Sequence, residues 1–111
     1  MQVLVNKIDY KKVNILNFET VSKRLNNIRE TLSSKYGLIK IGIFGSVARD
    51  EQNDNSDVDI LVELSQKISL LKFSGLYVDI EEELNTKVDV VDINDLRPEL
   101  AEIIKNEVRY I

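Results

Sequence analysis

Three short runs of β-branched and apolar residues, separated by stretches in which apolar residues recur every three or four positions, most constrain the fold of this chain. The runs are residues 38–44, 57–62 and 88–91. Such runs are typical of strands, whereas a three-to-four spacing is typical of amphipathic helices. A chain of 111 residues has room for one domain. We therefore predict a single small α/β domain in which helices pack against a mixed β-sheet.

The predicted order is helix, strand, strand, helix, strand, helix, and each helix has end signals in the sequence. The first helix has an N-cap at Asn17 and a stop at Gly37. The second helix begins at Leu70 and has a stop at Asn85. The last helix has an N-cap at Asn94 or Asp95 and carries Pro98 in its first turn. Residues 1–17 fit a short strand or a helix equally well. We treat them as an N-terminal extension of a domain that spans residues 18–111.

The composition removes several kinds of chemistry, because the chain has no cysteine and no histidine. Disulfides, thiolate nucleophiles, histidine-based triads and most transition-metal sites are excluded. Carboxylates, hydroxyls, lysine, arginine and oxygen-bound metals remain. The net charge of −4 and the pI near 4.9 argue against a protein that binds extended nucleic acid through many phosphate contacts.

The sequence gives no sign of a membrane segment. Charged residues interrupt the N-terminal region, and no stretch approaches the ~18 uncharged apolar residues of a spanning helix. We expect a cytoplasmic protein with no membrane partner.

Two carboxylates, Asp57 and Asp59, are two positions apart in a predicted strand. Residues i and i+2 of a strand point to the same face, so the two carboxylates can converge on a hard cation such as Mg²⁺. Alternatively, they are solvated acids on a strand whose opposite face, with Val58, Ile60 and Val62, packs in the core.

Gly45 and Ser46 lie where a predicted strand turns into a short helical turn at 46–49. Glycine lets a backbone approach a ligand closely, and free N–H groups with a serine hydroxyl can hold phosphate. The alternative is an ordinary turn capped by serine. The Walker pattern of P-loop proteins is absent from the sequence.

These elements occur in one spaced combination: Gly45-Ser46, ten intervening residues, then Asp57-x-Asp59, with a further strand carboxylate at Asp89. The stretch GSVARDEQNDNSDVDILVEL resembles the nucleotidyltransferase signature of the DNA polymerase β superfamily, most closely its minimal nucleotidyltransferase (MNT) branch. KVDVVD and the terminal ELAEIIKNEVRYI are similar to the end of MNT domains. The resemblance covers residues from about 20 to 111.

The resemblance implies a role for each matching residue. Gly45, Ser46 and the neighbouring backbone would hold the phosphates of a nucleoside triphosphate, with ATP as the substrate. Asp57, Asp59 and Asp89 would hold two Mg²⁺ ions, an arrangement that suits in-line displacement at phosphorus. Asp89 would also be the base toward an acceptor hydroxyl.

Three further residues bear on this interpretation. Arg49 could neutralise triphosphate charge, as the arginine of the family motif does, or form a surface ion pair with Asp50 or Glu51. Asp50 stands where family members usually carry glycine, so we expect a differently shaped loop. Asp92 is a rival to Asp89, but the family pattern places the third carboxylate in Val-Asp-Val.

MNT proteins of this size often pair with HEPN-domain ribonucleases in toxin–antitoxin modules. The resemblance therefore implies an antitoxin that transfers AMP from ATP to a tyrosine hydroxyl of a HEPN-type toxin. One alternative is a noncatalytic antitoxin that neutralises its partner by binding. The other is a nucleotidyltransferase that modifies a small hydroxylated compound such as an aminoglycoside.

Overall fold

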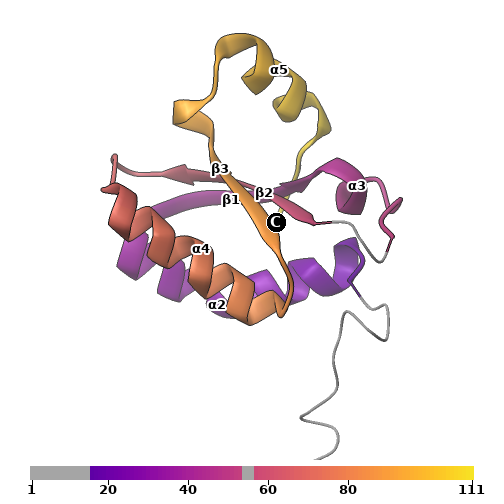
Figure 1. The fold of residues 1–111 in the computed structure, drawn as a ribbon, viewed down its shortest axis with the longest axis horizontal. Helices are drawn as coiled ribbons and strands as arrows, with labels where there is room; N and C mark the ends of the chain where they lie inside the picture. Colours follow the sequence, from indigo (N-terminus) through magenta and orange to yellow (C-terminus); the bar gives the residue numbers. More distant parts are fainter. Residues whose placement is uncertain (1–15, 54–56) are drawn as a thin grey trace, which may run out of the picture.

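The computed structural model describes residues 16–53 and 57–111, which contain a four-stranded sheet in the order β3-β2-β1-β4 (Figure 1). The elements are α2 (Phe18–Tyr36), β1 (Leu38–Phe44), α3 (Gly45–Ala48), β2 (Val58–Leu64), α4 (Leu70–Leu84), β3 (Val88–Asp92), a 3₁₀ turn η1 (Ile93–Asp95), α5 (Pro98–Glu107) and β4 (Arg109–Tyr110). β1 pairs antiparallel with β2 and β4, and β2 pairs parallel with β3. The predicted α/β class with a mixed sheet is confirmed.

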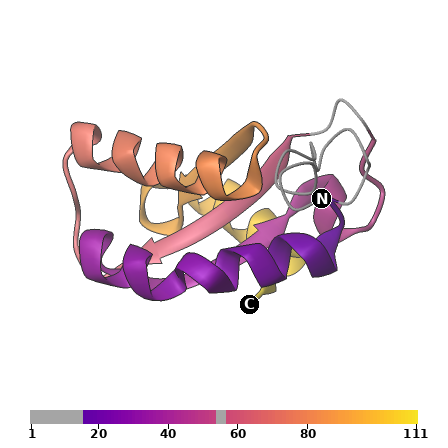
Figure 2. The same cartoon turned by 90° about the horizontal axis from the view of Figure 1, so that it is seen from below.

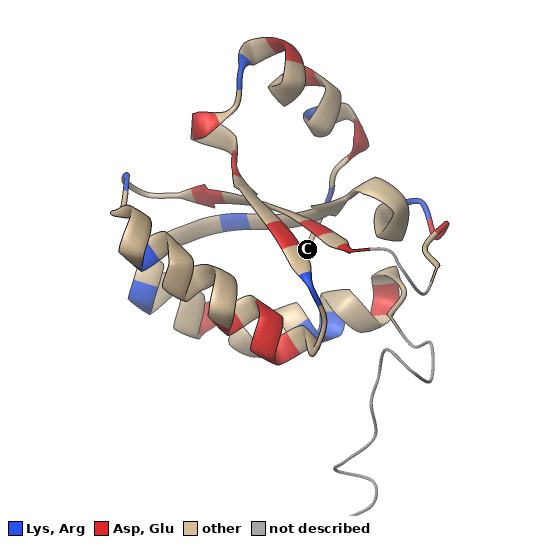
Figure 3. Ribbon diagram, viewed as in Figure 1, with Lys and Arg blue, Asp and Glu red and all other residues tan. Residues whose placement is uncertain are grey.

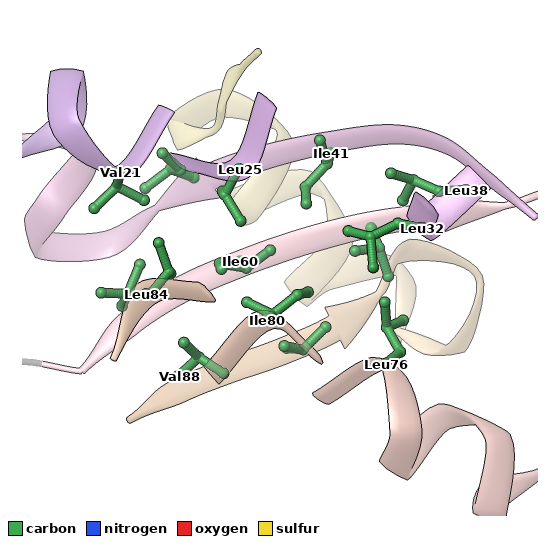
Figure 4. Packing of buried hydrophobic residues seen from close by; sticks show 14 of the residues in the cluster. Val21, Leu25, Leu32, Leu38, Ile41, Ile60, Leu76, Ile80, Leu84 and Val88 are labelled. Atoms are coloured by element: carbon green, nitrogen blue, oxygen red, sulfur yellow. The ribbon is translucent and has the colours of Figure 1, made fainter. Parts of the chain in front are cut away.

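Helices α2 and α4 lie beside each other over one face of the sheet, and α5 lies on the other side (Figures 1 and 2). The hydrophobic core fills the space between the two long helices and the sheet (Figure 4). Its fully buried side chains include Val21, Leu25, Leu32, Ile41, Ile60, Leu76, Ile80 and Leu84. Burial of this apolar surface is the main favourable contribution to folding.

Strand β2 presents alternate residues to the two faces of the sheet. Val58, Ile60 and Val62 are buried in the core under the helices, as the sequence predicts. The residues between them therefore face the side that carries α5. Leu61 is buried on that side, whereas Asp59 is only partly buried.

The predicted ends of the first two helices are confirmed. The Asn17 side chain accepts a hydrogen bond of 2.9 Å from the N–H of Thr20, and the Thr20 hydroxyl accepts one from the N–H of Asn17, which completes a capping box. Gly37 ends α2 in the left-handed conformation (φ 74°), as Asn85 ends α4 (φ 53°).

The N-cap predicted for the last helix at Asn94 or Asp95 is wrong. Both residues lie in η1, where the Asp92 side chain accepts a hydrogen bond from the Asn94 N–H. Arg97 is the N-cap of α5. A residue before proline is disfavoured in the helical region, so α5 begins at Pro98 itself.

The structure adds one strand that the sequence pattern does not indicate. β4 has two residues, pairing Tyr110 with Gly42 and Arg109 with Ile43. It covers the free edge of β1 with the end of the chain. The predicted strand at 57–62 is shifted, because β2 begins at Val58.

The N-terminal extension of residues 1–17 lies outside the described residues except for its last two. Leu16 packs into the core and Asn17 caps α2. Among the helices of the described residues, none is long and apolar enough to cross a membrane.

Candidate active site

The junction of β1 and α3 places a glycine directly against a carboxylate. Gly45 has φ 72°, and a Cβ atom on it would lie 2.1 Å from Oδ2 of Asp59. The strand register explains this approach, because Phe44 pairs with Asp59 across β1 and β2. Any side chain at position 45 would collide with the carboxylate and would also disfavour the left-handed backbone.

The parallel pairing of β2 and β3 brings two of the predicted carboxylates side by side. Asp59 is the register partner of Asp89. Both alternate away from the core residues of their strands, so they share the face opposite α2 and α4. Asp57 is exposed and lies just before β2. Figure 3 shows acidic residues on these two neighbouring strands.

The electrostatics of Asp59 reflect this crowding. Burial of its carboxylate is the largest cause that raises its pKa above the ordinary value of 3.8, and the nearby charges of Asp89, Asp57 and Glu107 raise the pKa further. Arg49 acts in the opposite direction. The acids around Asp59 therefore outweigh the opposing charge of Arg49.

The carboxylates fit a hard divalent cation in donor type and in charge. Such cations prefer oxygen ligands, and a bound cation would relieve the repulsion among the acids. In the parts of the chain that the structure describes, no three acidic side chains are gathered closely enough to form a ready metal group. The assignment of Asp57, Asp59 and Asp89 as metal ligands therefore stays a prediction.

Arg49 lies at the C-terminal end of α3 and forms two ion pairs. Its Nε lies 2.8 Å from Oε1 of Glu51, and its Nη1 contacts Oε1 of Glu107. The pair with Glu51 is the surface ion pair expected as the alternative role of this residue. The guanidinium is nevertheless close enough to Asp59 for each charge to affect the pKa of the other.

Glu107, the last residue of α5, is a site residue that the sequence pattern did not reveal. Its Oε1 accepts a hydrogen bond of 2.6 Å from the backbone N–H of Gly45 and contacts the Arg49 guanidinium. A glutamate 62 residues away along the chain thus binds the two groups assigned to phosphate. Only the terminal ELAEIIKNEVRYI segment, taken with the family resemblance, pointed to this region.

The structure also shows where Ser46, Asp50 and Asp92 lie. Ser46 follows Gly45 in α3, and its carbonyl oxygen accepts hydrogen bonds from the N–H groups of Arg49 and Glu51. Asp50 takes the left-handed conformation (φ 55°) that glycine adopts readily, so the loop can turn there without glycine. The side chain of Asp92, the alternative third carboxylate, caps η1, and Asp89 is the register partner of Asp59.

Arg109 of β4 supports the α3 turn from the other side. Its guanidinium donates a hydrogen bond of 3.1 Å to the Ala48 carbonyl and stacks 3.6 Å from the centre of the Phe18 ring. Cation–π contacts of this kind stabilise by roughly 0.5–2 kcal/mol. Arg109 thus links Ala48 of α3 to Phe18 at the start of α2.

The class of the protein follows from comparison with known families. The nucleotidyltransferase domain family matches residues 25–111. The chain belongs to the nucleotidyltransferase domain family, and it is an enzyme of that class.

Individual proteins and solved structures similar to this chain have more specific descriptions. The protein adenylyltransferase MntA of Thermococcus cleftensis is 36% identical over 97 residues, which cover 87% of this chain and 98% of that protein. A solved structure assigned as a minimal nucleotidyltransferase has a TM-score of 0.72 at 32% identity and covers 84% of this chain and 94% of its own. A solved toxin–antitoxin structure with AMP-PNP has a TM-score of 0.67 at 26% identity and covers 77% of this chain and 69% of its own.

We predict that Asp59→Asn makes the fold more stable at neutral pH in the presence of EDTA. The raised pKa means that ionised Asp59 costs stability in the folded state. That cost is absent below pH 3.8, the ordinary pKa, and grows as the pH rises to the folded-state pKa, above which it is complete. Thermal melts at pH 7.5 should give the variant a midpoint a few degrees higher.

The matched control is Asp95→Asn, which removes an exposed acid outside the site. The advantage of Asp59→Asn over the wild type should shrink as the pH is lowered toward 3.8. A variant that is no more stable than the wild type at pH 7.5 would show that ionised Asp59 does not destabilise the folded protein.

Proposed function

We propose that this chain is a Mg²⁺-dependent antitoxin that transfers AMP from ATP to a tyrosine hydroxyl of a HEPN-type ribonuclease toxin. One observation supports nucleotidyl transfer as the reaction. The Gly45 backbone lies directly against the carboxylate of Asp59, the register partner of Asp89. A turn suited to phosphate and a pair of carboxylates therefore meet at one point of the fold.

Each group has a task in this reaction. The N–H of Gly45, Ser46 and the Arg49 guanidinium bind the phosphates of ATP. Asp57, Asp59 and Asp89 hold Mg²⁺, which supplies stabilisation of the charge on the phosphates and of the leaving pyrophosphate.

The transfer balances without any further reactant. The acceptor oxygen forms a bond to the α-phosphorus while the bond from that phosphorus to the pyrophosphate oxygen breaks. The bonding electrons leave with pyrophosphate. Asp89 receives the proton of the acceptor hydroxyl.

The adenylyl group and the protein acceptor are supported by the relatives. The matched MntA of Thermococcus cleftensis is a protein adenylyltransferase, and the matched toxin–antitoxin structure contains AMP-PNP. An AMP group on a toxin tyrosine would add phosphate charge near the nuclease site and so oppose RNA binding.

The surface also offers contacts for a protein acceptor. Leu100 and Ile103 of α5 are 47% and 60% exposed, and α5 ends at Glu107 beside the site. Exposed apolar residues next to a site are typical of protein contact surfaces. The net charge of −4 favours encounter with a basic nuclease.

We predict that Asp89→Asn abolishes AMP transfer, whereas Asp92→Asn retains it. The two residues lie three positions apart in β3, but only Asp89 is paired with Asp59. The test is incubation of each variant with labelled ATP, Mg²⁺ and a purified HEPN-type protein as candidate partner, followed by mass spectrometry of the partner.

Wild-type protein should add AMP to a partner tyrosine, and Asp57→Ala should prevent it. A partner that is silenced in the complex yet carries no AMP would replace this proposal with neutralisation by binding. Transfer to an aminoglycoside and not to the partner would favour a small-molecule acceptor.

We also predict that Glu107→Gln tightens nucleotide binding severalfold. Glu107 contacts the N–H of Gly45 and the guanidinium of Arg49, which are proposed to hold phosphate. ATP must displace this carboxylate, and a neutral amide both holds Arg49 less strongly and removes repulsion of the phosphates. Calorimetric titration with a nonhydrolysable ATP analogue and Mg²⁺ measures the effect.

The control for this prediction is Glu102→Gln, an exposed glutamate of the same helix, which should leave the affinity as in the wild type. Weaker binding by Glu107→Gln would mean that the carboxylate arranges the phosphate site and does not compete with the nucleotide.

A further inference from the structure

Tyr77 of α4 forms two hydrogen bonds with β3, and one of them reaches the proposed third carboxylate. Its hydroxyl oxygen accepts a hydrogen bond of 3.0 Å from the N–H of Val90. Its proton is donated over 3.0 Å to Oδ1 of Asp89. A residue from the helix layer thus contacts a carboxylate that lies on the opposite face of the sheet.

The position of β3 makes this contact possible. In the sheet formed by residues 16–53 and 57–111, β3 is an edge strand, with β2 on one side only. The outward N–H of Val90 therefore has no strand partner within the sheet and is available to Tyr77. Because the phenol oxygen accepts from this N–H, its own proton is left to be donated to Asp89.

The ring of Tyr77 is itself held in place. It packs edge-on against Phe73 of α4, with ring centres 6.2 Å apart and planes at 69°. Tyr77 also packs against the hydrophobic core. The hydroxyl therefore presents its proton to Asp89 from a rigid support.

Asp89 needs such support more than its neighbour does. Its side chain is exposed, whereas Asp59 is partly buried against Gly45. An exposed aspartate exchanges rotamers unless a partner fixes it, and groups behind a metal ligand commonly fix its orientation.

We propose that Tyr77 is a positioning residue for nucleotidyl transfer, acting through its hydrogen bond to Asp89. This inference rests on the proposed function. The phenol holds Oδ1 of Asp89 at the outer edge of β3. It thereby fixes the rotamer of this side chain and leaves Oδ2 to meet the cation and the acceptor hydroxyl.

The chain provides a matched control for removal of this hydroxyl. Tyr36 of α2 donates a hydrogen bond of 2.7 Å to Asp79. This second Tyr–Asp pair joins α2 to α4, and Tyr36 lies beside Gly75. Tyr36→Phe therefore removes the same kind of bond without touching the proposed site.

The expected result is a difference between the two variants. Tyr77→Phe should weaken the binding of Mn²⁺ alone, followed by water-proton relaxation, by roughly 10-fold or more. It should lower kcat with little change in the KM for ATP, because Gly45, Ser46 and Arg49 are untouched. In metal-free protein it should also shift the ¹³C resonance of the Asp89 carboxyl. Tyr36→Phe should do none of these.

A double variant separates positioning from a structural role. In an Asp89→Asn background, the further change Tyr77→Phe should cost no additional Mn²⁺ affinity, because the residue acts through Asp89. An additional loss there, or a loss in Tyr36→Phe equal to that in Tyr77→Phe, would overturn the inference. Thermal melts of all variants show whether each remains folded.

The outcomes also separate this inference from the proposed function. A wild-type protein that binds Mn²⁺ and transfers AMP, with a Tyr77→Phe variant that does both equally well, contradicts only the role of Tyr77. A wild-type protein that neither binds Mn²⁺ nor transfers a nucleotide contradicts both proposals.

Discussion

The contact between the Gly45 backbone and the Asp59 carboxylate is the constraint on which the site depends. It requires a left-handed turn at the end of β1 and a register that sets Phe44 opposite Asp59. The antiparallel pairing of β1 and β2 supplies that register, and the parallel pairing of β2 and β3 then places Asp89 beside Asp59. Two ladders of backbone hydrogen bonds thus determine where the functional groups meet.

This arrangement has a cost in stability that a purely structural sheet would avoid. Asp59 is partly buried among like charges, which disfavours its ionised form. Arg49 offsets part of that charge, although it is also paired with Glu51 and Glu107. Destabilised charge of this kind is typical of functional sites, because a ligand of opposite charge recovers the lost energy.

Much of the fold could be predicted from the sequence because its signals are local. The spacing of apolar residues located the long helices, and Asn17, Gly37 and Asn85 marked their ends through capping and left-handed turns. The spaced Gly-Ser and Asp-x-Asp motif identified the family and the neighbouring carboxylates. The site roles assigned from that motif stay predictions.

The features that the sequence did not reveal depend on contacts distant along the chain. Glu107 reaches Gly45 across 62 positions, and Tyr77 of α4 reaches Asp89 at the outer edge of β3. β4 is two residues long, too short for any periodicity. The wrong N-cap arose because Asn94 and Asp95 are good caps by type, whereas Pro98 determined where the helix begins.

The most direct test of the central claim is calorimetric titration of a nonhydrolysable ATP analogue, with Mg²⁺, into Gly45→Ala and the wild type. The new Cβ would lie 2.1 Å from Oδ2 of Asp59, so the turn and the carboxylate must separate. The account predicts that the variant stays folded by circular dichroism and loses nucleotide binding. Binding by a folded Gly45→Ala variant with wild-type affinity would contradict it.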